Sequence, residues 1–441
     1  RAAEERLSTF ECEKKELPHA TAPTTTQDAA IGDRGLSEKR TRELQANMPR
    51  PPADGFSEPV AVPDRWRIVD ALGYKERWWD PYNQNSWKGD KPFYQNGKDK
   101  WFFAFTGISD TVMEYRRLPT PVGGQSTDNA GAYDNFGKGN QYAYVQNLAT
   151  EFVVYKGNTV FMPPEIEFRF TPVFNWNRVE LDERLGLYTD PSQGPTRSDS
   201  HVGIQAAFVD YHLRNVSSRF DFDSLRVGVQ PITADFRGFL FNDNQLGIRL
   251  FGNRDNNLYQ YNLAWFRRIE KDTNSGLNDL GAPLRDDDIF LVNLYRQDLF
   301  LKGFTSQAVV LYNRNRENKE YYYDQNGFLT RPAAIGTEIP RQYDVTYLGY
   351  NGDGHLGLYN LSVSAYYAFG QEKPSVFTRE DSDIRAGFAA MEISRDFDWI
   401  RARLSALHGS GDDDPYDDVS GGFDAVLENP LFAGADTSFW I

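Results

Sequence analysis

Residues 359–369 read YNLSVSAYYAF, a strict alternation that few folds accommodate. Successive side chains of a β-strand point to opposite faces. One face of this stretch carries Tyr359, Leu361, Val363, Ala365, Tyr367 and Phe369, and the other carries Asn360, Ser362 and Ser364. An apolar face that ends in aromatic rings, opposite small polar groups, is typical of a strand between lipid and a wet interior. We therefore predict a membrane-spanning strand here.

Runs of similar length recur along the chain, separated by clusters of Gly, Pro, Asn and Asp. A tilted strand needs about 9–11 residues to cross a bilayer. The runs are residues 101–116, 142–155, 166–176, 202–213, 224–231, 240–251, 258–268, 289–301, 304–314, 343–350, 359–369, 384–394 and 399–408. Their long polar connections, expected outside the cell, are residues 119–141, 187–200, 271–287, 315–342 and 409–422. We predict an all-β fold, an antiparallel up-and-down transmembrane β-barrel of about 14–18 strands.

Arginine recurs on the polar face of several runs. In SLRVGVQP the apolar residues share one face, and Arg226 and Gln230 share the other. A lipid-facing Arg near the bilayer midplane costs roughly 2–4 kcal/mol, so the arginine face should be the lumen. The predicted pore-lining residues are Arg226, Gln230, Arg249, Arg401 and Arg403. These cations would favour anionic solutes, unless they pair with lumenal carboxylates and simply fill the interior.

The run at residues 289–294 breaks the alternation, because apolar residues occupy both of its faces. Such a strand is buried on both sides. Either a loop folded into the lumen or the second layer of a soluble sandwich would explain it.

Aromatic residues are expected at the membrane interface, where amphipathic rings are favoured. Tyr359, Tyr367 and Phe369 are the predicted interface aromatics. A Trp-rich stretch at residues 64–100 is expected to enter or plug the barrel, which would span residues 101–441. Residues 1–63 are charged and rich in Pro, Thr and Ala, so we predict a disordered or partly helical extension.

The composition narrows the class of protein. The chain has 441 residues, 40% of them hydrophobic, a mean hydropathy of -0.62 and a net charge of -15. No apolar run approaches the roughly 20 residues of a membrane helix, so a membrane would be crossed by strands. The negative charge argues against a nucleic-acid partner, because phosphate binding relies on clustered Lys and Arg. The only cysteine, Cys12, has no partner for an intramolecular disulfide.

No motif points to an enzyme or a cofactor. The five histidines are scattered, without the spacing of a zinc site. Nucleophile elbows, P-loops and dinucleotide fingerprints are missing from suitable contexts. Asp412, Asp413 and Asp414 are weak candidates for a calcium site, since clustered carboxylates suit a hard cation. A solvated loop is the simpler interpretation of that run.

Residues 208–243, FVDYHLRNVSSRFDFDSLRVGVQPITADFRGFLFND, carry a further signal. They resemble a stretch of Gram-negative porins of the alginate-export and carbohydrate-selective types. In those proteins a strand ending near Val-Asp-Tyr precedes a hairpin and a strand reading roughly Leu-Arg-x-Gly-x-Gln. The matching residues here are Val209, Asp210, Tyr211, Leu225, Arg226, Gly228 and Gln230. The resemblance implies a porin-like barrel in a bacterial outer membrane, without specifying one solute.

These observations predict an outer-membrane channel for passive diffusion of small hydrophilic solutes, either anions or carbohydrates. Its partners would be outer-membrane lipid, lipopolysaccharide and the solutes, and other copies of the chain if it oligomerises. Because the chain begins at Arg1 and ends in ADTSFWI, we expect a processed protein or a fragment that lacks further strands.

Two alternatives stay open. One is a soluble secreted all-β protein that binds carbohydrate or degrades polysaccharide, which would bury the apolar face of each strand in a single core. The other is a non-conducting structural barrel.

Overall fold

The computed structural model of the protein describes residues 73, 77, 85–97, 99–118, 139–157, 163–218, 221–333, 337–430 and 432–433. All of them belong to one compact unit, Pro59–Ile441. The predicted extension at residues 1–63 lies outside the described residues, as does most of the Trp-rich stretch. No helix in the described part of the chain is long and apolar enough to cross a membrane.

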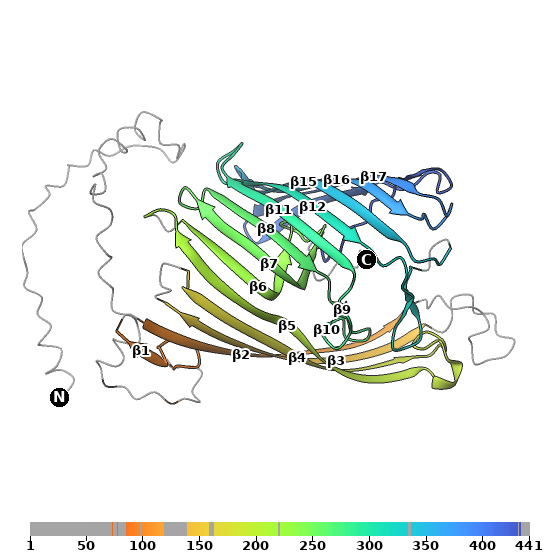
Figure 1. Ribbon diagram of the computed structural model, residues 1–441, viewed down its shortest axis with the longest axis horizontal. Coiled ribbons are helices and arrows are strands. Elements are labelled where there is room, and N and C mark those ends of the chain that lie inside the picture. Colours follow the sequence, from red (N-terminus) through yellow and green to blue (C-terminus); the bar gives the residue numbers. More distant parts are fainter. Residues whose placement is uncertain are drawn as a thin grey trace, which may run out of the picture. The chain divides into compact units, whose positions relative to one another are not determined.

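The described residues form one 15-stranded sheet in which successive strands pair antiparallel. Figure 1 shows the labelled strands following one another around the sheet in chain order. Its strands are β1 (Tyr94–Asn96), β2 (Asp99–Arg117), β3 (Asn140–Lys156), β4 (Ile166–Leu181), β5 (Thr196–Asn215), β6 (Phe222–Thr233), β7 (Asn242–Arg254), β8 (Tyr259–Arg267), β11 (Asp287–Gln297), β12 (Phe304–Asn315), β15 (Gln342–Leu356), β16 (Tyr359–Lys373), β17 (Ser382–Phe397), β18 (Ile400–Gly409) and β19 (Val419–Ser420). Only β19, which pairs with β17, is parallel to its neighbour. Two hairpins lie in loops: β9 (Glu270–Lys271) with β10 (Asn278–Asp279), and β13 (Tyr322–Tyr323) with β14 (Leu329–Arg331).

The predicted fold class is confirmed: the chain is all-β, antiparallel and up-and-down, with the strand order of a β-barrel. Each run predicted from the sequence contains a strand, from β2 to β18, although the run at residues 289–301 extends beyond β11, which ends at Gln297. Within the described residues, the long side of β18 that faces away from β17 carries no strand. The predicted long connections lie between β2 and β3, β4 and β5, β8 and β11, β12 and β15, and after β18. In an antiparallel meander these positions are all at the same end of the strands, which we call the long-loop end. Connections as short as residues 357–358 gather at the other, the short-turn end.

The outward face of the sheet is apolar. In register, Val292 of β11 lies opposite Val310 of β12, which lies opposite Leu348 of β15. Exposed apolar residues on this face include Phe170, Phe174, Val227, Ile248, Leu263, Val292, Val310, Leu348, Tyr367 and Met391. Soluble antiparallel sheets point the apolar face toward their core, so this sheet is reversed relative to them.

The inward face of the same strands is polar and buried. Its buried residues include Asn175, Asp210, Gln245, Asn262, Asn293, Gln307, Asn351, Ser364 and Glu392. The amide groups pair across strands: Asn262 Nδ2 donates to Asn293 Oδ1 at 2.7 Å, and Asn351 Nδ2 donates to Gln307 Oε1 at 3.1 Å. Hydrogen bonds of this kind remove the cost of burying polar groups.

Charged residues border the outward apolar band at both ends. On β11 the apolar residues lie between Asp288 and Arg296, and on β17 between Arg385 and Arg395. These separations correspond to roughly 26–33 Å along a strand at ~3.3 Å per residue, or roughly 20–27 Å in height at a barrel-like tilt. The apolar band of an outer-membrane barrel has this height, about 25 Å.

Two segments fold onto the inward face and build a hydrophobic core against β8 to β17. The first inward segment, residues 234–241, follows β6, and the second, residues 422–430 with 432–433, follows β19. They contact each other through Val426 N, which donates to Leu240 O at 3.1 Å. Leu240 and Phe241 are fully buried. The prediction that a strand starts at residue 240 was wrong, since β7 starts at Asn242.

This core explains why residues 289–294 are apolar on both faces. Ile289 and Leu291 point inward and belong to the core, whereas Phe290 and Val292 point outward and are exposed. A segment folded inside the sheet, rather than a second sheet layer, therefore covers the inward side of this strand.

Candidate functional site

The inward face of β5 to β7 carries two neighbouring arginines. Arg226 on β6 lies opposite Arg249 on β7 in register. Arg226 donates to Asp210 Oδ2 from Nε at 3.0 Å and from Nη2 at 2.8 Å, and its guanidinium lies 4.3 Å from the centre of the Phe208 ring. Asp210 therefore offsets the charge of Arg226. This pairing is what we expect if the arginines pair with lumenal carboxylates and simply fill the interior.

Arg249 differs from its neighbour. Its Nε donates to the neutral Asn262 Oδ1 at 2.7 Å, and its guanidinium lies 4.8 Å from the centre of the Phe251 ring. In the part of the chain that the structure describes, Arg249 forms no ion pair. Two like charges this close are compensated by one carboxylate, so an excess positive charge lies on the inward face beside β7.

Gln230 also points inward but is 0% exposed. Its Nε2 donates to Gly247 O at 3.1 Å across the β6–β7 pair. It therefore stabilises the wall and has no surface for a solute to contact, which corrects its assignment as a pore-lining residue.

Arg401 and Arg403, at the start of β18, point inward as predicted, because Arg401 lies opposite Asp396 and Arg403 opposite Ser394. Arg401 Nη2 lies 2.9 Å from Asp396 Oδ2, and Arg403 Nε lies 3.5 Å from Glu392 Oε1. Both line a polar cavity of about 290 Å³ near the short-turn end, together with Arg237 from the first inward segment.

Arg237 ties the first inward segment to strands far along the chain. Its Nε donates to Ser362 Oγ at 2.9 Å, and its Nη2 donates to Glu392 Oε1 at 3.3 Å. The turn that contains it is held by Asp235, whose carboxylate accepts backbone N–H groups of Arg237 at 2.8 Å and Leu240 at 3.0 Å. The first inward segment is thus held by hydrogen bonds within its own turn and by the contacts of Arg237 with β16 and β17.

The predicted interface aromatics occupy the outward face. Tyr359 is 43% exposed, Tyr367 is 50% exposed and Phe369 is 39% exposed. Tyr359 starts β16 at the short-turn end, and Phe369 lies toward the long-loop end. They therefore stand toward opposite borders of the apolar band, where interfacial rings are favoured.

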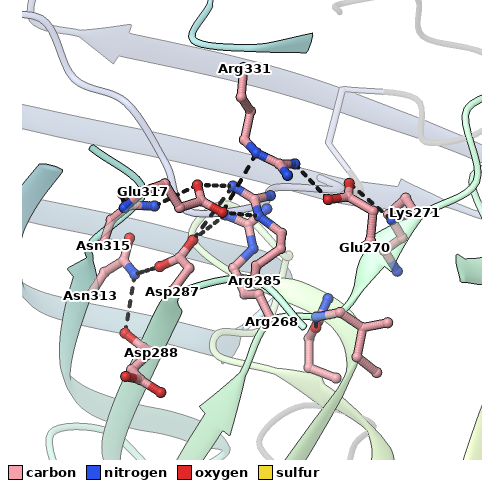
Figure 2. Close-up of polar contacts among 12 residues, drawn as sticks. Arg268, Glu270, Lys271, Arg285, Asp287, Asp288, Asn313, Asn315, Glu317 and Arg331 are labelled. Carbon is pink, nitrogen blue, oxygen red and sulfur yellow. Dashed lines mark hydrogen bonds and ion pairs between the residues drawn. The ribbon is translucent and has the colours of Figure 1, made fainter. Parts of the chain in front are cut away.

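A buried ion-pair network joins two neighbouring loops at the long-loop end. Figure 2 shows the side chains that form it. Arg285, just before β11, donates to Glu317 Oε1 at 3.0 Å and Oε2 at 2.8 Å. Arg331 of β14 reaches Glu270 of β9 at 2.7 Å, and Arg268 Nη1 lies 2.9 Å from Asp287 Oδ2. The network binds the loop of residues 268–286 to the loop of residues 316–341.

The charges in this network control the ionisation of its members. Burial opposes the charged form of Glu317, but the hydrogen bonds and positive charge of Arg285 lower its pKa to about 2. Burial likewise disfavours the charged Arg285, and its contacts with Glu317 more than offset this, so its pKa is raised. Both groups stay charged at neutral pH.

The weak calcium candidates do not converge. Asp412, Asp413 and Asp414 are exposed, and Asp414 Oδ1 accepts the Tyr416 N–H at 3.1 Å. Among the described residues, no group of three or more His, Cys, Asp or Glu side chains is arranged to hold a metal ion.

Sequence reasoning offered a loop folded into the lumen as one explanation of residues 289–294, but it did not locate the two inward segments, Arg237 or the loop network. One signal was available: in ITADFRGFLFND an apolar triplet follows Gly238, ahead of the strand alternation. That triplet is the core-forming end of the first inward segment, next to β7.

No protein-family model matches the sequence, and no curated protein matches it. Among solved structures, the chain aligns with OmpT (in-vitro folded), an outer membrane protein of Vibrio cholerae, at 9% identity and a TM-score of 0.27. That alignment covers 76% of this chain and 95% of the other.

Proposed function

We propose that this chain forms a β-barrel wall in a bacterial outer membrane and conducts small hydrophilic solutes by passive diffusion. The reversed sheet is the observation that carries the proposal: exposed apolar residues cover the outward face, and hydrogen-bonded polar residues cover the inward face. In water this arrangement would expose the apolar face along the whole sheet, whereas in lipid it buries that face and keeps a polar interior.

The proposed solutes are small anions or polar neutral molecules such as carbohydrates. Arg249, with no carboxylate partner among the described residues, gives the inward face at β7 an excess positive charge that lowers the energy of a passing anion. The inward segments occupy space against β8 to β17, so the passage would run along the inward face of β5 to β7. Long loops would face the outside and lipopolysaccharide.

A non-conducting barrel is the second candidate, and the inward segments favour it. Together they cover the inward face of six strands with a hydrophobic core. A barrel filled in this way would serve as a scaffold in the membrane. A soluble carbohydrate-active protein is disfavoured by the exposed apolar band, whose borders are charged at both ends.

The test is to express the natural full-length protein with an export signal, purify it from outer membranes in detergent, and record currents in planar lipid bilayers. Stable conductance steps with anion preference support the proposal. A protein that inserts yet never conducts would instead establish the structural barrel, and one that fractionates as soluble without detergent would overturn both membrane readings.

A further inference from the structure

The cavity of about 290 Å³ beside Arg403 has features of a built binding site. It lies between Arg237 of the first inward segment and the strands β15 to β18, near the short-turn end of those strands. A volume of this size holds roughly ten water molecules at ~30 Å³ each, so it fits a solute with the bulk of a single sugar. It is also near the lower bound of roughly 300 Å³ for small-molecule pockets.

Arg403 supplies the site with an available positive charge. Its Nε lies 3.5 Å from Glu392 Oε1. Its two terminal nitrogens form no hydrogen bond within the part of the chain that the structure describes. A guanidinium with a free pair of parallel N–H groups matches the geometry of a carboxylate.

The remaining wall is rich in groups that bind hydroxyls. Glu392 is 5% exposed and accepts Ser405 Oγ at 3.0 Å as well as Arg237. Ser394 and Asn360 also line the cavity, and Asn360 Nδ2 donates to Ser394 Oγ at 3.3 Å. Hydroxyl groups of a solute can donate to carboxylates and can both donate to and accept from serine.

The charge balance disfavours a ligand with more than one negative charge. Three cations line the cavity, Arg237, Arg401 and Arg403, beside the anions Asp353 and Glu392, and Arg401 is already paired with Asp396. Arg237 and Arg403 then face Asp353 and Glu392, so opposite charges are matched before a solute enters. A dianion such as a phosphate ester, at about -1.5 to -2, would meet more repulsion from Glu392 and Asp353 than a monocarboxylate.

We infer that this cavity is a binding subsite for a small polyhydroxylated monocarboxylate, with Arg403 as the residue that holds its carboxylate. The inference rests on the proposed channel and names the class of solute that pauses in it. The solute would lie at the short-turn end, where its hydroxyls would contact Glu392, Ser394 and Asn360.

The experiment uses the purified full-length protein and three probes: gluconate, acetate and sorbitol. Acetate keeps the carboxylate without the hydroxyls, and sorbitol keeps the hydroxyls without the charge. Binding is read in two ways, as interruptions of the bilayer current and as heat released when the probe is titrated into detergent-solubilised protein. We expect gluconate to bind at least about tenfold more tightly than either partial probe, since a charge-assisted hydrogen bond contributes about 1.5–3 kcal/mol.

Arg403→Gln should weaken gluconate binding about tenfold or more, and Arg403→Lys should restore part of it, because lysine keeps the charge but not the paired N–H groups. The matched control is Arg385→Gln, which removes an exposed arginine from the outward face of β17 and should leave binding unchanged. Equal binding of all three probes, or gluconate binding that survives Arg403→Gln, would overturn the subsite. If calorimetry shows the gluconate preference in a protein that never conducts, the subsite stands and the channel proposal fails.

Discussion

The inward faces of β5 to β7 and of β11 to β17 belong to one continuous sheet but are filled in different ways. Beside β7, Arg226 and Arg249 stack on aromatic rings, and Asp210 compensates only the charge of Arg226. Beside β11 to β17, the two inward segments pack a hydrophobic core in which Leu311 is 0% exposed. We call these the charged side and the packed side.

The outward faces of the two sides are alike, since Val227 and Val292 are exposed to 45% and 48%. One solvent outside the sheet imposes one rule on every strand. No such rule acts inside, so each side of the interior is free to acquire its own filling. Because the two sides differ only in what fills the interior, we expect functional residues on the charged side and at its border with the packed side, where Arg237 lies.

The largest expected effect comes from emptying the packed side. Phe241→Ala removes a fully buried ring whose centre lies 6.1 Å from the centre of the Phe266 ring. It should lower the free energy of unfolding by about 3–5 kcal/mol, measured by urea titration of the reconstituted protein. The control is Phe300→Ala, the same truncation at a 68% exposed position in a turn, which should cost little. Equal losses in both variants would mean that the inward segments do not stabilise the wall.

The second test asks whether the two sides truly share one outward face. Val227→Arg and Val292→Arg each place a charge in the middle of the apolar band, which should cost roughly 2–4 kcal/mol in a bilayer. The two losses should be similar when unfolding is measured in lipid vesicles. A variant that tolerates arginine on one side only would show that this part of the outward face is covered by something other than lipid.

The third test concerns the loops above the packed side. Glu317 has a folded pKa of about 2, below the unfolded value, so its stabilising contribution is present above about pH 4.5 and is lost as the pH falls toward 2. Glu317→Gln should cost on the order of 1–3 kcal/mol at pH 7. The difference from the parent protein should shrink in acid, as followed by thermal unfolding at several pH values.

Glu320→Gln is the matched control for this test, because Glu320 lies in the same loop but is exposed. Its stability curve should follow that of the parent protein at every pH. A Glu317→Gln deficit that does not change between pH 7 and pH 2 would contradict the ion-pair explanation.

The smallest expected effect is on ion selectivity at the charged side. Arg249→Gln removes the inward charge that has no carboxylate partner among the described residues, so the anion-to-cation permeability ratio should fall by about twofold. Reversal potentials across a salt gradient measure this ratio. Arg296→Gln is the control, since Arg296 lies at the border of the outward band and should not alter selectivity. A fall in the ratio in both variants would place the effect outside the interior.

The sequence alone was sufficient to predict the strands, their faces and the alternation of long and short connections. Each of these depends on neighbours within a few residues: the side-chain period of a strand places Tyr367 and Phe369 outward and Ser362 and Ser364 inward. The proposed lipid environment would make that period visible, because lipid favours an apolar residue at every second position.

The filling of the interior was decided by tertiary structure. Whether Arg226 is paired and Arg249 is not depends on Asp210 and Asn262, which reach them across strands. The contact between Arg237 and Glu392 joins residues 155 positions apart. Such contacts form only when the sheet brings distant strands around the same interior, and no local pattern in the sequence encodes which inward side chains will meet.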